Sequence, residues 1–208
     1  MTNDKGINKY DLCDYLPNNI IKKMFEELND SNKDGNEQGF FICSNAKNMK
    51  DMNNENTITT ERVIGSKESV DKEESKCPKD LQRIGNFHTH PPFKNIILKD
   101  YYIKTYGIDA EQKILGNPSV GDMWYAINNA FEFSCIGAKD GIKCFSTNNK
   151  EKIHEDRNKY ILRQKREWRK DQGTIKKPKY RERMIKFDEW HARELEKRHM
   201  FCEMKSDK

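Results

Sequence analysis

The sequence predicts an α/β domain in which helices pack against a mixed β-sheet. Two segments show the apolar spacing of helices, and five short apolar runs between or beside them are rich in β-forming residues. The elements follow one another as helix, three strands, a long inserted segment, helix and hairpin. Because helices and strands are interspersed along the chain, we expect the helices to cover the sheet.

The first half supplies one helix and three strands. Residues 17–30, PNNIIKKMFEELND, place apolar side chains at helical intervals and begin with Pro17. Strands are expected in EQGFFICS (37–44), in TITTERVIGS (57–66) and from 81 to 88.

The second half of the predicted domain contains a helix and a hairpin. Residues 118–131 have the spacing of a core-facing helix, with Ser119 as a candidate N-cap and Met123 on the apolar stripe. Two apolar runs follow, 133–138 and 142–146, and the Asp-Gly pair between them is typical of a tight hairpin turn.

Composition indicates a compact part and a solvated part. Charged residues make up 35% of the 208-residue chain and hydrophobic residues 34%, which is polar for a fully globular protein. No apolar run approaches the roughly 18 residues that span a membrane, and the first residues lack the apolar stretch of a signal peptide. We therefore expect a cytoplasmic protein.

The six cysteines are scattered along the chain without a CxxC pair. Cys43, Cys135 and Cys144 lie in apolar, strand-like runs, where free thiols behave as small buried hydrophobes. Because nothing indicates secretion, the sequence predicts free thiols and no disulfide framework.

A candidate metal site centres on IGNFHTHPPF, residues 84–93. His88 and His90 are separated by one residue at the end of a predicted strand, so their side chains share one face. A catalytic zinc site takes three protein ligands and leaves a fourth position for water. Asp122, in the first turn of the next helix, is the candidate third ligand, and the hydroxyl of Ser119 is expected nearby.

Each part of this pattern also has a purely structural interpretation. Ser119 and Asp122 have the spacing of a capping box, in which both side chains satisfy N–H groups at a helix start. An isolated His-x-His is commonly incidental. The combination of both patterns in one chain favours the metal site.

These residues resemble the JAMM (MPN-plus, JAB) zinc metalloproteases. The family pattern has an upstream Glu before an apolar strand, then H-[ST]-H-P, then P-S-x-x-D. Here NEQGFFICS supplies Glu37, HTHP begins at His88, and NPSVGD supplies Ser119 and Asp122. The resemblance extends over residues 17–146.

The resemblance implies a mixed sheet flanked by helices and a zinc ion held by His88, His90 and Asp122. It further implies that Glu37 acts as the base for a zinc-activated water and that Ser119 stabilises the oxyanion. Family members hydrolyse isopeptide or peptide bonds, commonly those that join ubiquitin-like proteins to lysines, and some act on small conjugates.

One segment departs from the family pattern, and two other acids compete with Glu37 for its role. Residues 91–118 are longer than the usual link and are interpreted either as a substrate-contacting flap or as a loop with its own packing. Glu55 and Glu61 are rival acids to Glu37 for the role of base.

The C-terminal region, 147–208, is a basic extension beyond the predicted 1–146 domain. It has 20 Lys and Arg against 12 Asp and Glu, and its two charged segments, 150–172 and about 180–204, favour helices. An arm that packs on the domain or pairs with a second copy explains this pattern better than nucleic-acid binding, because acids are mixed among the bases.

The leading prediction is thus a zinc isopeptidase or peptidase acting on a protein, peptide or small conjugate. The alternative is a non-catalytic MPN-like scaffold that assembles with partners through its helical arm. His191, His199 and Cys202 lie on about one side of the second arm helix, but they lack a fourth ligand and are not assigned a metal.

Overall fold

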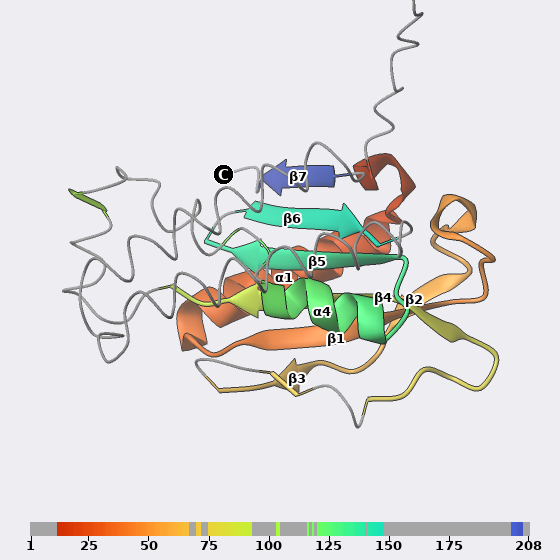
Figure 1. Ribbon diagram of the computed structural model, residues 1–208. Helices are drawn as coiled ribbons and strands as arrows, with labels where there is room; N and C mark the ends of the chain where they lie inside the picture. The colour runs from red at the N-terminus through yellow and green to blue at the C-terminus, as the bar shows by residue number, and fades with distance from the viewer. Residues whose placement is uncertain are drawn as a thin grey trace, which may run out of the picture.

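A single mixed β-sheet organises the protein (Figure 1). The strand order is β2-β1-β4-β5-β6-β7, and β3 pairs with β1 beside β2. The computed structural model describes residues 12–66, 70–71, 75–92, 103–104, 116, 118, 120–139, 141–147 and 201–205. The strands are β1 (Gln38–Ser44), β2 (Thr57–Thr59), β3 (Val63–Ile64), β4 (Gln82–His90), β5 (Phe133–Ala138), β6 (Gly141–Ser146) and β7 (Phe201–Lys205).

Two helices lie on opposite faces of the sheet, α1 (Asn18–Asp34) on one and α4 (Val120–Asn128) on the other (Figure 1). Helix α1 ends at Gly35, whose left-handed φ of 65° suits glycine and lets its N–H donate to the carbonyl of Ser31. Two short 3-10 helices, η1 (Leu12–Tyr15) and η2 (Met49–Asp51), are also described.

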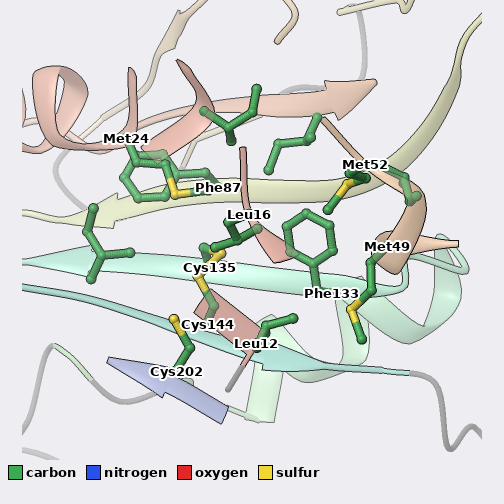
Figure 2. Packing of buried hydrophobic residues seen from close by; sticks show 14 of the residues in the cluster. Leu12, Leu16, Met24, Met49, Met52, Phe87, Phe133, Cys135, Cys144 and Cys202 are labelled. Atoms are coloured by element: carbon green, nitrogen blue, oxygen red, sulfur yellow. A yellow bond between two sulfur atoms is a disulfide. The ribbon is translucent and has the colours of Figure 1, made fainter. Parts of the chain in front are cut away.

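Each face of the sheet has its own apolar core. Beneath α1, the larger core joins the helix and η1 to the sheet, and Figure 2 shows Phe87 and Phe133 among its side chains. Beneath α4, Phe41, Phe131 and Ile136 pack with residues of the helix. The alternation of side chains along each strand therefore supplies both cores from one sheet.

An ion cluster ties α1 to the connection between β2 and β3. The Glu27 carboxylate is 1% exposed and lies 2.7 Å from Lys23 Nζ and 3.4 Å from an Arg62 guanidinium nitrogen. Arg62 also donates to Asp30 at 2.6 Å, and this hydrogen bond, with the charge of Glu27, raises the pKa of Arg62.

Strand β4 is central, because it pairs antiparallel with β1 and parallel with β5. Its register with β1 shifts where Ile42 pairs with Gly85 and Cys43 pairs with Arg83, so β4 carries one extra residue, Ile84. Gly85 lies directly beside Phe133 of β5, whose ring occupies the space that a side chain at Gly85 would need.

Replacing Gly85 by Ala is therefore expected to destabilise the fold by about 1–3 kcal/mol, the usual cost of overpacking. A Cβ atom there would lie 2.6 Å from Phe133 Cζ, which forces the ring or the strand to move. Gly137→Ala is the matched control, since its nearest atom is 3.0 Å away, and it should cost less. Denaturant unfolding measures both, and equal losses would contradict the argument.

Most of the predicted elements are confirmed. The helix expected from 17 to 30 is α1, which continues to Asp34, and the hairpin is β5 and β6. The strand expected over 57–66 is wrong as one element: the chain leaves the sheet edge between β2 and β3, which pair with different parts of β1.

The helix expected to reach residue 204 is wrong at its end. Phe201–Lys205 forms β7, which pairs antiparallel with β6 and extends the sheet. A strand is favoured there because Cys202 lies opposite Cys144 and packs in the core beneath α1. The rest of the predicted arm, 148–200, lies outside the described residues, as does most of 91–118.

The prediction of free thiols is also wrong, since all six cysteines form disulfides. The strands place Cys135 opposite Cys144, a pairing that sequence spacing alone did not reveal. The other two bridges join segments distant in sequence, with Cα separations of 5.3 and 5.8 Å: Cys13–Cys202 and Cys43–Cys77.

Within the described part of the chain, no helix is both long and apolar enough to cross a bilayer.

Candidate metal centre

The end of β4 presents His88 and His90 on the face covered by α4. His88 pairs with Gly39 of β1 on one side and with Ile136 of β5 on the other, and Ile136 belongs to the core beneath α4. Because strand side chains alternate, His90 shares this face while Thr89 points to the opposite one. The prediction that the two imidazoles lie side by side is confirmed by a ring-centroid distance of 5.0 Å.

Asp122 reaches the same point from the first turn of α4. One carboxylate oxygen lies 3.0 Å from His88 Nε2, and the other lies 3.8 Å from His90 Nε2. The two Nε2 atoms are 3.2 Å apart. Three side chains from two elements, separated by more than 30 residues of sequence, thus direct their ligand atoms to one position.

These three residues form a group that could hold one metal ion. One ligand atom from each residue lies within 4.8 Å of the other two, and ligands about 2.0–2.1 Å from a tetrahedral zinc ion lie roughly 3.3 Å from one another. The His88, His90 and Asp122 side chains are 8%, 17% and 15% exposed, so the group is largely shielded from solvent. Two imidazoles and one carboxylate form a donor set typical of catalytic zinc.

Among the described residues, no other group of three His, Cys, Asp or Glu side chains brings its ligand atoms this close together. Cys202, considered with His191 and His199 for a second metal site, is bonded to Cys13 and is not a thiolate ligand. Both of those histidines lie outside the described residues.

Glu37 immediately precedes β1. It therefore lies at the end of β1 that is nearest to the histidines. Gly39 pairs with His88 in the last pair of the β1–β4 ladder, so Glu37 lies two residues beyond that pair, at the histidine end of the ladder. The same alternation puts its side chain on the histidine face, and the residue is half-buried. Glu37 is not one of the three converging ligands.

The rival acids lie farther along the neighbouring strands. Glu55 is exposed in the turn before β2. Thr57 of β2 pairs with Ser44, which is at one end of β1, and Glu37 is at the other end. Glu61 is exposed between β2 and β3, at the outer edge of the sheet. Ser119, the predicted oxyanion donor, lies outside the described residues, so its capping and catalytic interpretations both stay predictions.

Sequence reasoning missed Thr89 and Ser31. Both hydroxyl groups are fully buried and hydrogen-bonded to each other, with 2.7 Å between the oxygens. The Thr between the two histidines was read only as a spacer in the motif. Its position on the opposite face of the same strand was the available signal that it contacts α1.

Comparison of the chain with protein-family models, with curated proteins and with solved structures finds no match in any of the three.

Proposed function

We propose that the protein is a zinc-dependent isopeptidase or peptidase that hydrolyses an amide bond. The observation that carries the proposal is the convergence of His88 Nε2, His90 Nε2 and the Asp122 carboxylate at spacings suited to one zinc ion. The position of Glu37 beside this group, and the resemblance of the motif residues to JAMM proteases, support hydrolysis over a purely structural metal.

In the proposed reaction, His88, His90 and Asp122 would hold the ion. When bound, zinc lowers the pKa of a water molecule to near neutrality and polarises a substrate carbonyl. The carboxylate of Glu37 accepts a proton from the attacking water as its oxygen bonds to the carbonyl carbon. Glu37 then passes that proton to the leaving amine as the C–N bond breaks, and the hydroxyl of Ser119 donates a hydrogen bond to the oxyanion.

The substrate class follows from the resemblance alone: a ubiquitin-like protein joined to a lysine, or a small conjugate. A partner or second copy bound through 147–208, the absence of nucleic-acid binding and a cytoplasmic location stay predictions.

Zinc content tests the metal site directly. The chain purified without a histidine tag should hold about one zinc ion, and Asp122→Asn should hold far less because it removes the charged ligand. Asp51→Asn is the matched control, since Asp51 is an exposed carboxylate that also lies in the first turn of a helix, and it should retain full zinc. His90→Ala should behave like Asp122→Asn.

Elemental analysis of the four proteins, before and after zinc is added back, measures the result. Equal and negligible zinc in all four would overturn the proposal. The histidines and Asp122 would then form only a hydrogen-bonded group, and the non-catalytic scaffold would become the better account.

A further inference from the structure

The connection between α1 and β1, residues 35–37, carries the proposed base and is held by hydrogen bonds on both sides. Before it, α1 ends with Ser31 fully buried near its last turn. After it, Gln38 is the first residue of β1 and is fully buried, and its backbone N–H makes a hydrogen bond. Both ends of the connection are tied to Thr89, which lies between the two histidines.

The ties form a chain of donors and acceptors. The Gln38 N–H donates to Thr89 Oγ1 at 2.9 Å, and the Thr89 hydroxyl donates to Ser31 Oγ at 2.7 Å. The Ser31 hydroxyl in turn donates to the carbonyl of Asn36 at 2.8 Å. The Thr89 and Ser31 hydroxyl groups each accept one hydrogen bond and donate one. The chain begins at Gln38 and ends at Asn36, the two residues that flank Glu37.

The backbone of Glu37 itself is held from the other side by the residues that follow β3. Its N–H donates to the carbonyl of Ser66 at 2.8 Å, and its carbonyl accepts from the N–H of Gly65, also at 2.8 Å. Together with the Thr89 ties, these bonds hold the backbone of residues 36–38 against both neighbouring strands. The side chain of Glu37 therefore starts from a well-defined point.

We propose that Thr89 is a positioning residue that couples the strand bearing the zinc ligands to the segment bearing the base. Thr89 lies between His88 and His90 in β4, with its side chain on the opposite face of the sheet. Its hydroxyl therefore fixes the position of the Gln38 amide relative to both ligands. This inference rests on the proposed function for the role of Glu37, whereas the hydrogen bonds themselves stand independently. A displacement of about 1 Å between a base and its reacting water costs up to about 100-fold in rate.

Thr60 provides a control for a purely structural role. Its Oγ1 accepts from the backbone N–H of another β1 residue, Phe41, at 3.0 Å, and that hydrogen bond is also buried. The two threonines thus make the same kind of bond to the same strand, but on opposite edges. Thr60 lies away from the histidines, at the outer edge toward β2 and β3.

The test compares Thr89→Val, Thr89→Ser and Thr60→Val in the full chain loaded with zinc. Amide hydrogen exchange reports the Gln38 N–H directly, zinc content reports the ligands, and kcat and KM are measured on a fluorescent ubiquitin–lysine isopeptide conjugate. Thr89→Val should speed exchange at Gln38 and lower kcat about 10- to 100-fold with zinc content and KM little changed. Thr89→Ser keeps the hydroxyl and should restore most of the rate, and Thr60→Val should keep kcat.

Three results would overturn the proposal while leaving the proposed function intact: unchanged exchange at Gln38 in Thr89→Val, full kcat in that variant, or an equal loss of kcat in Thr60→Val. Failure of the proposed function has a different signature, because the wild-type chain would then hold no zinc or would leave the conjugate uncut. In that case the role of Thr89 in catalysis falls too, and exchange at Gln38 decides only whether the hydrogen-bond chain exists.

Discussion

Replacing Glu37 by Gln is expected to lower the rate of hydrolysis by about 10²- to 10⁴-fold while zinc binding stays unchanged. The substitution keeps the size and the hydrogen-bonding reach of the side chain but removes its ability to take a proton. Because the three converging ligand atoms belong to His88, His90 and Asp122, the ion should remain at about one per chain. Zinc analysis and turnover of an isopeptide conjugate, measured on the same preparation, separate the two effects.

Glu61→Gln and Glu55→Gln are the matched controls. Both remove a carboxylate from the same half of the chain, at exposed positions that the strand pairing places farther from the histidines than Glu37. Both variants should therefore keep full activity. A fully active Glu37→Gln variant would show that the base is another residue. Loss of zinc in that variant would instead show that Glu37 acts as a ligand, contrary to its placement outside the converging group.

Removing the Cys13–Cys202 bridge is expected to destabilise the fold more than removing either other disulfide. In the chain-entropy model the contribution grows with the loop closed. The separation of 189 residues corresponds to about 5 kcal/mol, and separations of 34 and 9 residues correspond to roughly 4 and 2.5 kcal/mol. Paired Cys→Ala variants of each bridge, unfolded by denaturant, should follow this order.

Cys202 gives the first bridge a local consequence as well. It lies in β7, which pairs only with β6 among the described strands, and the disulfide ties this edge strand to η1. Without the bridge, the amides of β7 should exchange faster than those of β4 or β5, which are paired on both sides. Uniform loss of protection across the sheet would contradict this local effect.

A thiol count establishes whether the bridges form. The denatured, unreduced chain should react with no thiol reagent, and the reduced chain should show six thiols. Stable disulfides are typical of oxidising compartments, whereas the sequence led us to expect a cytoplasmic protein. Six free thiols in the denatured, unreduced chain would show that the paired cysteines are adjacent but not bonded.

Local patterns predicted those parts of the molecule that depend on near neighbours in the chain. The 3.6-residue spacing defined α1, the Asp-Gly turn defined the β5–β6 hairpin, and alternation along a strand put His88 and His90 on one face. Each of these features depends on backbone geometry within about ten residues. Asp122 was assigned by combining two such local patterns, and its proximity to both histidines agrees with that assignment.

Tertiary structure alone decided the features that depend on distant segments. Six cysteines allow fifteen pairings, and only the tertiary packing selects among them. The sheet puts both Cys135 and Cys202 opposite Cys144, and Cys202 is bonded instead to Cys13 of η1. Residues 201–205 have the local composition of a helix end, yet the open edge of β6 and the core beneath α1 make them a strand. The contact of Thr89 with Ser31 and Gln38 likewise joins three elements. The periodicity of a single segment cannot predict such a contact, because the contact is determined by how the elements pack.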